Sequence, residues 1–392
     1  MGTKKIILLI LLNLILIFVL VHFLVTNTDT KIISLSTYHD FTTSRFLFYM
    51  DRKDMSFSEN QSTVFRMSIL RKKHPVQFPS LKCTVLNYSS LKQLMTEQIL
   101  EVPIKKNYII DLYNVWTSLP NDYKSDSRFL VWYPFDRVER FDFPIIVKSR
   151  WNYDDNHCKQ INFHPSYCAK GTSILLKLNK MRHYDDFYNL MNGNIKDTSF
   201  HKKKSKVVWR GQSTGYGFGN NIPFRPQSRE SLVRLYATLP NNDPRSSFID
   251  IGLTGKVKEE YLIYLKNTMT TEELLQHKYV ISMEGNDVAT NLKCFIASQS
   301  IVMMPKPRVE SWFMESFLIP YRHYIPLKDD CSDVWEQFQW AESHPDECQT
   351  ILTHANNHAK YFFSLKNESE LEKKVLMSYL DHFTWIQDVP MK

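Results

Sequence analysis

Glycine is scarce in this chain of 392 residues, which contains only 10. That scarcity excludes collagen-like and glycine-rich low-complexity folds. No repeat of fixed period occurs, which argues against a solenoid or a propeller. No C-x-x-C pair is present, so neither a zinc ribbon nor a thioredoxin-like site is supported. The sequence also lacks G-x-x-x-x-G-K-[ST] and G-x-G-x-x-G, which disfavours P-loop and dinucleotide sites.

Charge of one sign is also not in large excess. The 49 basic and 41 acidic residues give a formal net charge of +8, and 43% of the residues are apolar. These values exclude wholesale disorder, and the length suffices for two domains of ordinary size. The charge permits an anionic small substrate or an acidic membrane surface, and it is weak evidence for nucleic acid. The basic segment 201–206 has no interleaved aromatics, so we expect a solvated linker there and no nucleic-acid partner.

A single long apolar run lies near the amino terminus. Ile6–Val25 is apolar except for Asn13 and His22, and as a helix it would span about 30 Å, one hydrocarbon core. No Ala-x-Ala site follows, which favours an uncleaved signal anchor over a removed signal peptide. Lys4 and Lys5 would stay cytoplasmic, giving a single-pass type II membrane protein whose bulk is lumenal or external.

Six cysteines are present, and an even number suits an oxidising compartment. Cys158 with Cys168, and Cys331 with Cys348, are plausible local disulfides because each pair brackets a loop-like stretch.

Short apolar runs bounded by polar turns predict buried strands of a parallel sheet at 108–112, 129–132 and 144–147. The second half alternates expected strands with expected helices, and this alternation predicts a doubly wound α/β domain. Ser228 and Thr270 or Thr271 are the expected helix N-caps. The strands are expected at 207–209, 279–283 and 301–304, and the helices at 228–237, from 271, at 290–298 and at 368–383. We expect three regions: 1–30 with the anchor, a domain at 31–200 and a second domain at 201–392.

Four of the ten glycines fall within nine residues, at Gly211, Gly215, Gly217 and Gly219. They follow an expected strand and precede an expected helix, so the backbone there turns tightly or approaches a ligand. Such a loop favours phosphate, because free amides and the helix dipole face the anion. A mobile loop without a ligand is the alternative, and the glycines alone do not decide.

A second strand-to-helix connection spans 283–293. Ligands of open α/β sheets bind beyond the carboxyl ends of strands, so this is an expected site position. Glu284 could accept from ribose hydroxyls, and Asn291 and Lys293 could reach phosphate from the first helical turn. A solvated turn at Glu284 and Asp287, with Lys293 exposed, explains the same residues.

Four motifs follow one another along the chain: Trp209-Arg210-Gly211, Ser228-Arg229-Glu230-Ser231-Leu232, Tyr279 through Lys293 and His323-Tyr324-Ile325-Pro326-Leu327. Together they resemble glycosyltransferase family 90. This family includes protein O-glucosyltransferases, fungal capsule xylosyltransferases and bacterial lipopolysaccharide-core transferases. The resemblance extends from Phe129 to Phe363, and residues 31–125 match nothing recognisable. The lipopolysaccharide-core branch is the most similar, through 284–293, Met304-Pro305-Lys306-Pro307, Trp312-Phe313-Met314-Glu315, 146–150 and 174–183.

The resemblance implies a GT-B architecture, in which two Rossmann-like domains face each other across a cleft. It also implies an inverting transfer of a sugar from a UDP-sugar to a glycan, lipid-linked or protein acceptor, with no permanently bound cofactor. The family's glucosyltransferase branch uses an Asp as base in an Arg-Asp-Tyr-Pro context. Asp136 in Tyr133-Pro134-Phe135-Asp136 is the best match despite its different local sequence, and Asp142 is the alternative. The alternative that this Asp only caps a loop is not excluded by the sequence.

The resemblance also assigns residues to the leaving diphosphate, where donors must meet growing negative charge. Arg229 is the leading ligand, and Gln212 holds the position of a family Ser. Asn291 stands where the glucosyltransferase branch has Arg, so Lys293, Arg225 or the glycine-loop amides would have to compensate. Arg210 has a structural alternative, an ion pair with a carboxylate beneath the loop. The remaining expected binding residues are Gly211, Glu284, Gly285, Asn286 and Asp287.

Dependence on a divalent metal stays open. The family has no obligatory D-x-D and none occurs here, while the adjacent Asp pairs at 154–155, 185–186 and 329–330 suit surface turns. His183 and His323 are candidate metal ligands that packing or acceptor hydrogen bonds explain equally well. A non-catalytic sugar-binding or scaffold protein on the same fold is the alternative function.

Overall fold

The structure is a computed structural model, and its contacts divide the chain into two compact units, Met1–Phe48 and Tyr49–Lys392. All elements given below lie in the second unit. The segment Ile6–Val25 lies outside the described residues, and none of the helices described is long and apolar enough to cross a bilayer. The residues described are Arg45, Tyr49, 63–67, 84–96, 103–136, 138, 144–152, 173–215 and 228–387.

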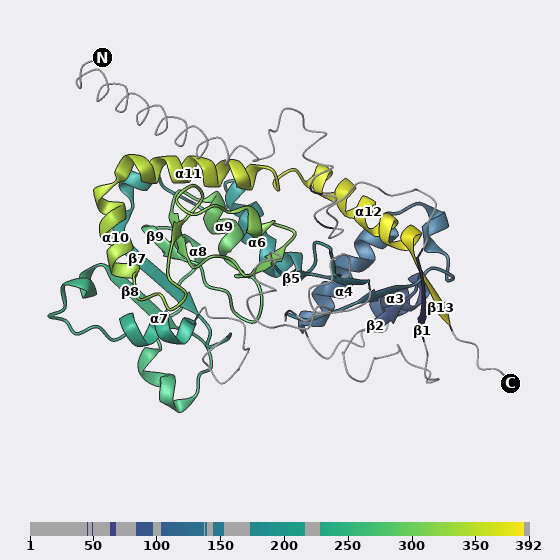
Figure 1. The fold of residues 1–392 in the computed structure, drawn as a ribbon, viewed down its shortest axis with the longest axis horizontal. Coiled ribbons are helices and arrows are strands. Elements are labelled where there is room, and N and C mark those ends of the chain that lie inside the picture. The colour runs from purple at the N-terminus through teal and green to yellow at the C-terminus, as the bar shows by residue number, and fades with distance from the viewer. Residues whose placement is uncertain are drawn as a thin grey trace, which may run out of the picture. The chain divides into compact units, whose positions relative to one another are not determined.

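Strands and α-helices alternate from residue 173 to residue 304 (Figure 1). The strands are β1 (Thr63–Met67), β2 (Thr84–Leu86), β3 (Leu130–Trp132), β4 (Ile145–Val147), β5 (Ser149–Trp151), β6 (Ser173–Leu175), β7 (Lys204–Gly211), β8 (Ile249–Leu253), β9 (His277–Ile281), β10 (Ile301–Met304), β11 (Val309–Ser311), β12 (Ile325–Pro326) and β13 (Phe383–Gln387). The α-helices are α3 (Tyr88–Thr96), α4 (Pro103–Thr117), α6 (Lys180–Met191), α7 (Arg229–Tyr236), α8 (Thr271–Leu274), α9 (Leu292–Ala297), α10 (Val334–Ser343), α11 (Pro345–Lys360) and α12 (Leu365–His382).

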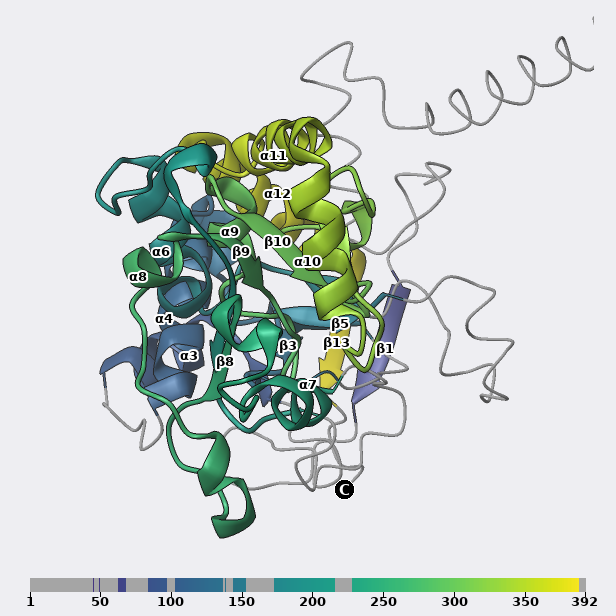
Figure 2. The same cartoon turned by 90° about the vertical axis from the view of Figure 1, so that its left-hand side faces the viewer.

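The larger sheet has five strands in the order β12-β10-β9-β7-β8, and every neighbouring pair is parallel. Its buried side chains, such as Trp209 and Ile281, form one core with Phe338 of α10 and Ile351 of α11. Figure 2 shows α10 and α11 beside this sheet. Because all five strands run the same way, their carboxyl ends share one edge, where ligands of such sheets bind.

The smaller sheet has four strands in the order β2-β3-β4-β6, with β2 antiparallel to β3 and the other pairs parallel. Helix α12 returns to it from the far end of the sequence and packs against α4 (Figure 1). The hydroxyl of Tyr379 accepts from the Val131 amide and donates to the Pro144 carbonyl, each at 3.1 Å. A buried tyrosine therefore fastens α12 to β3 and to the start of β4.

Several contacts join the smaller sheet to the larger one. In a separate two-stranded sheet β5 pairs antiparallel with β11, and buried Arg150 donates to Glu310 at 2.7 Å. Helix α6, which follows β6, packs against α9, which follows β9. The expected mixed α/β architecture with parallel sheets is confirmed.

Several local predictions are also confirmed. Strands lie at 130–132, 145–147 and 301–304. Ser228 is the N-cap of α7, where its hydroxyl accepts from the Ser231 amide at 3.0 Å. Thr270 caps α8 through a capping box with Glu273. These caps use side-chain oxygens for amides that the first helical turn leaves without partners.

The strand expected at 108–112 is wrong, because these residues lie in helix α4. Tyr108, Ile109, Asp111 and Leu112 are all buried, so the run shows no polar face. A short apolar run without periodicity does not distinguish a buried strand from a buried helix.

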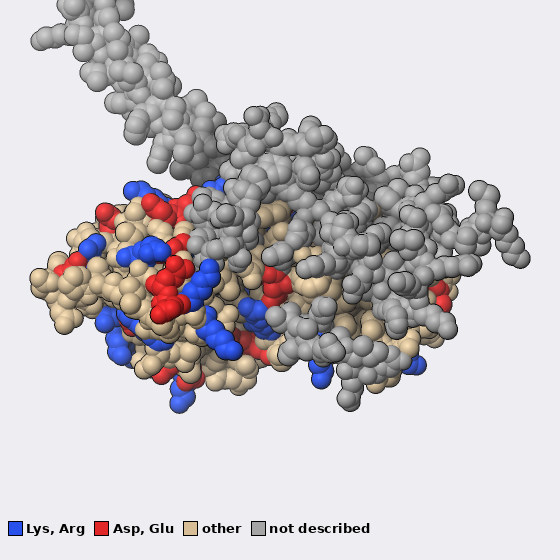
Figure 3. All heavy atoms as spheres, turned by 90° about the horizontal axis from the view of Figure 1, so that it is seen from below, with Lys and Arg blue, Asp and Glu red and all other residues tan. Residues whose placement is uncertain are grey.

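The solvated linker expected at 201–206 is also wrong. Strand β7 begins at Lys204, and Lys203 is buried in an ion pair with Asp197. On the face seen in Figure 3, basic and acidic side chains are interspersed over the described part.

The proposed Cys331–Cys348 disulfide is not formed, since both are buried free thiols. The Cys331 thiol contacts Met283 Sδ at 3.6 Å, and the Cys348 thiol contacts the Ala341 carbonyl at 3.4 Å. Burial raises the pKa of Cys348 to about 12, so it stays a neutral thiol. Cys158 and Cys168 lie outside the described residues.

Candidate functional site

A pocket of about 440 Å³ opens at the carboxyl ends of β7, β8 and β9. Its walls are the connections after those strands, helix α6 and the segment after β3, and its volume is within the usual range of small-molecule sites. The predicted residues that line it are Asp136, Arg210, Gly211, Gln212, Arg229, Gly285, Asn286, Asp287 and Asn291.

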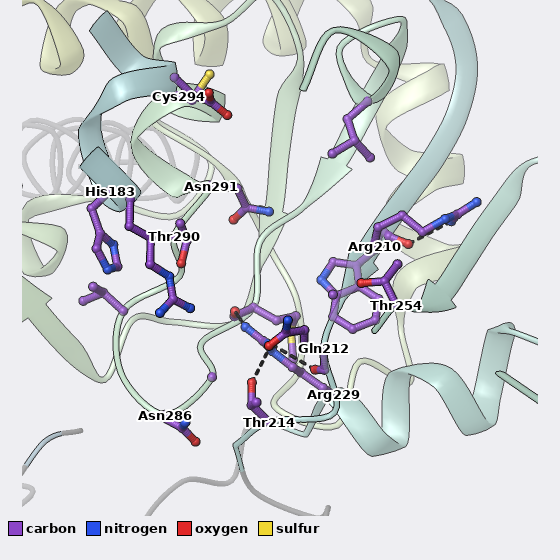
Figure 4. A pocket seen from close by; sticks show the side chains of 18 of the residues that line it. His183, Arg210, Gln212, Thr214, Arg229, Thr254, Asn286, Thr290, Asn291 and Cys294 are labelled. Atoms are coloured by element: carbon purple, nitrogen blue, oxygen red, sulfur yellow. Dashed lines mark hydrogen bonds between the residues drawn. The ribbon is translucent and has the colours of Figure 1, made fainter. Parts of the chain in front are cut away.

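Arg229, the first residue of α7, ties the two glycine-bearing connections together (Figure 4). Its guanidinium donates to the carbonyls of Met283 at 2.7 Å, Glu284 at 3.0 Å and Gln212 at 3.1 Å. It also donates to the Thr214 hydroxyl at 2.9 Å. These four oxygens are neutral, and together they fix a positive charge where the two loops meet.

Glycine is required where these loops touch. Gly215 has a φ of +94°, which disfavours other residues, and a Cβ there would lie 3.1 Å from the Gly285 carbonyl oxygen. A Cβ on Gly285 would lie 2.9 Å from both Arg229 Nη2 and Thr214 Oγ1. The backbone at Gly285 therefore lies directly against the guanidinium.

Arg210 lines the pocket, and its guanidinium is hydrogen-bonded to residues outside the pocket lining. It donates to the Asp250 carboxylate at 2.9 Å and to the Asp250 and Asn267 carbonyls at 3.0 Å. The ion pair with a carboxylate that was expected as the structural alternative for Arg210 is therefore present, with Asp250. The next residue, Gly211, packs against the ring of Trp209, which leaves no room for a Cβ.

Asp136 follows β3 and faces the pocket from the smaller sheet. Its Oδ1 accepts from Tyr108 at 2.6 Å, from Lys148 at 2.5 Å and from Asn179 at 3.4 Å. Its Oδ2 pairs with Arg182 of α6. Burial opposes ionisation, but Lys148, the Tyr108 hydrogen bond and Arg182 together outweigh it and lower the pKa of Asp136.

The Lys148 ammonium lies at the centre of a polar cluster. It contacts Asp136 Oδ1, Asp287 Oδ2 and His183 Nε2, the last at 2.9 Å. Within the described part of the chain, those three groups are the set whose ligand atoms lie close enough together, within 4.8 Å, to hold a metal ion. An ammonium has three donors and no acceptor, so each partner receives one N–H.

His183 is neutral at this position. Burial and the nearby charge of Lys148 lower its pKa well below the ordinary value. Its Nε2 accepts from Lys148, so the ring proton is on Nδ1. His323, the other candidate ligand, is not among the residues that line this pocket, and its Nδ1 accepts from the Ile319 amide at 2.9 Å.

Two predicted site residues do not line the pocket. Glu284 Oε1 accepts from the amides of Arg308 and Val309, each at 2.9 Å, so its carboxylate fastens the connection to β11. Lys293 is 0% exposed and donates to Glu315 at 3.0 Å. Contrary to expectation, Lys293 is therefore positioned as a buried structural ion-pair partner and not as a phosphate ligand. Asp142 and Arg225 lie outside the described residues.

Sequence reasoning missed Arg182 and Lys148 as members of the site. Both lie in segments used for the family resemblance, 174–183 and 146–150. For Lys148 the available signal was a basic residue directly after the strand expected at 144–147. Arg182, Thr254 and Thr268, which line the pocket, had no such signal.

The comparisons with known proteins agree with this geometry. A family model described as glycosyl transferase family 90 matches residues 150–388. The O-glucosyltransferase LpsA of Dichelobacter nodosus is 31% identical over 269 residues, covering 66% of this chain and 71% of that protein. Protein O-glucosyltransferase 2 of Danio rerio is 28% identical over 157 residues, 38% of this chain and 27% of that protein.

Among solved structures, a glycosyltransferase from Rickettsia africae aligns over 60% of this chain and 64% of that one. Its identity is 10% and its TM-score is 0.30, too low to carry an argument. The family model covers more than half of the chain, and the residues that it spans include nearly the whole pocket. We conclude that this chain belongs to glycosyltransferase family 90 and is a glycosyltransferase.

Proposed function

We propose that the enzyme transfers a sugar, such as glucose or xylose, from a UDP-sugar to a hydroxyl of a glycan, lipid-linked or protein acceptor, with inversion. The observation that supports this proposal is that Asp136, from the segment after β3 of the smaller sheet, and Arg229, the first residue of α7, line one pocket. The carboxylate can take the proton of an acceptor hydroxyl as its oxygen attacks the sugar. The cation can stabilise the negative charge that grows on the departing diphosphate.

Asp136 is the general base in this proposal. The acceptor oxygen attacks the anomeric carbon while its proton passes to Asp136. The bond between that carbon and the β-phosphate oxygen breaks, and its electron pair leaves with UDP. Because attack and departure occur on opposite faces of the sugar, one displacement inverts the anomeric centre. The lowered pKa of Asp136 keeps the carboxylate ionised at neutral pH.

Arg229 and the loop amides around Gly285 receive the diphosphate. The guanidinium already has a fixed position through four hydrogen bonds, so little rearrangement opposes its interaction with developing charge. Gln212, Asn286 and Asn291 line the same pocket and would orient the rest of the donor. In this proposal the UDP-sugar is a substrate, and the reaction needs no permanently bound cofactor.

We propose that the reaction proceeds without a divalent ion. Lys148 already places a cation in contact with Asp136, Asp287 and His183. A metal ion at that point would have to displace the ammonium from these three acceptors.

The finer architecture is part of the same proposal. The two sheets would represent the two Rossmann-like halves of a GT-B enzyme, divided near residue 200 into an acceptor-side and a donor-side domain. Ile6–Val25 would anchor a type II membrane protein whose catalytic part is lumenal or external, on the grounds of its length and apolar composition.

The test uses the full-length chain with UDP-glucose, UDP-xylose and UDP-galactose in turn, and p-nitrophenyl glycosides as acceptors. UDP is measured by chromatography, and the anomeric configuration of the product by NMR. We expect one donor to react with inversion and D136N to lower its turnover by about 10²–10⁴-fold, the usual contribution of a general base.

The matched control is D185N, which changes an exposed carboxylate on α6. It should keep wild-type turnover. Unchanged turnover in D136N would reject Asp136 as the base, and retention of configuration would reject a single displacement. Absence of UDP release above the enzyme-free rate with every donor would reject UDP-sugar transfer.

A further inference from the structure

The two carboxylate oxygens of Asp136 have different surroundings. Oδ1 accepts three hydrogen bonds, from Tyr108, Lys148 and Asn179. Oδ2 has one partner among the described residues, the Arg182 guanidinium. Oδ1 is therefore saturated, and Oδ2 is the oxygen that can take up a proton once its partner leaves.

The two cations on Asp136 also differ in how firmly they are held. The Lys148 side chain is 3% exposed and has two further partners, Asp287 and His183. The Arg182 side chain is 45% exposed. Asp136 is its only hydrogen-bond or ion-pair partner within the described part of the chain. Lys148 is thus a fixed part of the site, whereas Arg182 is attached at one point and can move.

We propose that the donor's diphosphate draws Arg182 away from Asp136 Oδ2, so that donor binding uncovers the basic oxygen. This inference rests on the proposed function. Arg182 and Arg229 line the same pocket, and the diphosphate is a stronger partner than one carboxylate. It carries more charge, and its oxygens match the planar guanidinium in a bidentate manner.

The exchange would give the enzyme an order of events. Without donor, Arg182 occupies the lone pairs of Oδ2, and an acceptor hydroxyl has no oxygen to donate to. With donor bound, the same guanidinium neutralises the diphosphate and leaves Oδ2 open beside the anomeric carbon. Arg182 also supplies a positive charge on the pocket wall, where Lys293, buried against Glu315, does not.

The test is a double-mutant cycle on UDP binding, measured by calorimetry with the full-length wild type, R182Q, D136N and R182Q/D136N. R182Q should weaken UDP binding about tenfold, because a charge-assisted contact to phosphate is lost. D136N should tighten it about threefold, because Arg182 no longer leaves an ion pair to reach the phosphate.

The double variant separates this mechanism from simple repulsion between Asp136 and UDP. If Arg182 mediates the effect, D136N should change UDP affinity by less than about 1.5-fold in the R182Q background. An equal effect of D136N in both backgrounds, or unchanged affinity in R182Q, would overturn the inference while UDP binding stands. Wild-type protein that binds no UDP would reject the proposed function and this inference with it. Thermal unfolding of all four proteins checks that each is folded.

Discussion

The ammonium of Lys148 contacts the carboxylate of Asp287, and the two residues belong to connections that follow strands of different sheets. Ser149 beside Lys148 also donates to Asp287, at 3.3 Å. The buried Lys148–Asp287 ion pair thus joins the walls of the pocket. The same ammonium also forms an ion pair with Asp136. The proposed base Asp136 therefore shares one electrostatic network with Asp287 and His183.

The first prediction concerns pH. The lowered pKa of Asp136 keeps its carboxylate ionised below the ordinary range of about 3.9, so activity should show no acid limb near pH 5. Y108F removes one hydrogen bond to the ionised form and should raise the pKa of Asp136. The acid limb of kcat should then move to higher pH. A pH profile identical to wild type would contradict this role of Tyr108.

The same shift has a consequence for stability. The contribution from the ion pairs of Asp136 is fully present above the ordinary Asp pKa of about 3.9 and is lost as the pH falls through the lowered native value. In Y108F this contribution should be smaller and its loss should be complete at a higher pH, because the native pKa lies closer to the unfolded value; acid unfolding followed by fluorescence would detect both.

The second prediction concerns metal ions. Treatment with excess EDTA should leave turnover unchanged, because Lys148 already meets the three groups that could bind a metal. UDP should be quantified directly by chromatography, so that no metal-dependent coupling enzyme enters the measurement. Loss of turnover that Mn²⁺ restores would show that a metal displaces Lys148 during the reaction.

The third prediction tests the contact between Gly285 and Arg229. G285A places a methyl group 2.9 Å from Nη2 of Arg229 and from Oγ1 of Thr214. The guanidinium is held by four hydrogen bonds and must shift, so UDP affinity should fall about tenfold.

The matched control is G193A. Gly193 has a φ of +79° and no atom within 4 Å of an added Cβ. G193A should lower the free energy of unfolding by about 1 kcal/mol through backbone strain and leave UDP affinity unchanged. Equal effects of both variants on UDP would point to a general loss of stability.

The fourth prediction separates structure from binding at Lys293. K293M leaves the buried Glu315 carboxylate without its cation, so the free energy of unfolding should fall by about 3–5 kcal/mol. K293M/E315Q should recover part of that loss, because no buried charge remains. Denaturant unfolding measures both. A stable K293M protein with weakened UDP binding would instead support the phosphate role.

The fold was predictable where residues repeat a clear local pattern. The strands at 130–132, 145–147 and 301–304 are short apolar runs with polar ends, and Ser228 and Thr270 are side chains suited to caps. The helix at Tyr108 was missed because the run 108–112 is too short to show a helical period, and the exposed Lys106, Asn114 and Thr117 of the same helix lie outside it. The position of Lys203 against Asp197 was hidden by the surrounding lysines.

The candidate site was predictable in its loops and less so in its charges. Gly211, Gly285 and Arg229 line the pocket as expected from their strand-to-helix connections, whereas Gly217 and Gly219 lie outside the described residues. Whether a cation faces a pocket or a buried carboxylate depends on distant residues. Lys293 is buried against Glu315, whereas Arg182 pairs with Asp136 on the pocket wall. In each case the position of the cation is set by a carboxylate far away in the sequence.

The attachment of Tyr379 to Val131 and Pro144 bears on the timing of biosynthesis. The smaller sheet is among the first parts of the described chain to leave the ribosome, and the helix that completes it is among the last. Its strands must wait, with apolar surface uncovered, until residues 365–382 emerge. A chaperone that shields β3 and β4 during translation should therefore increase the yield of folded enzyme.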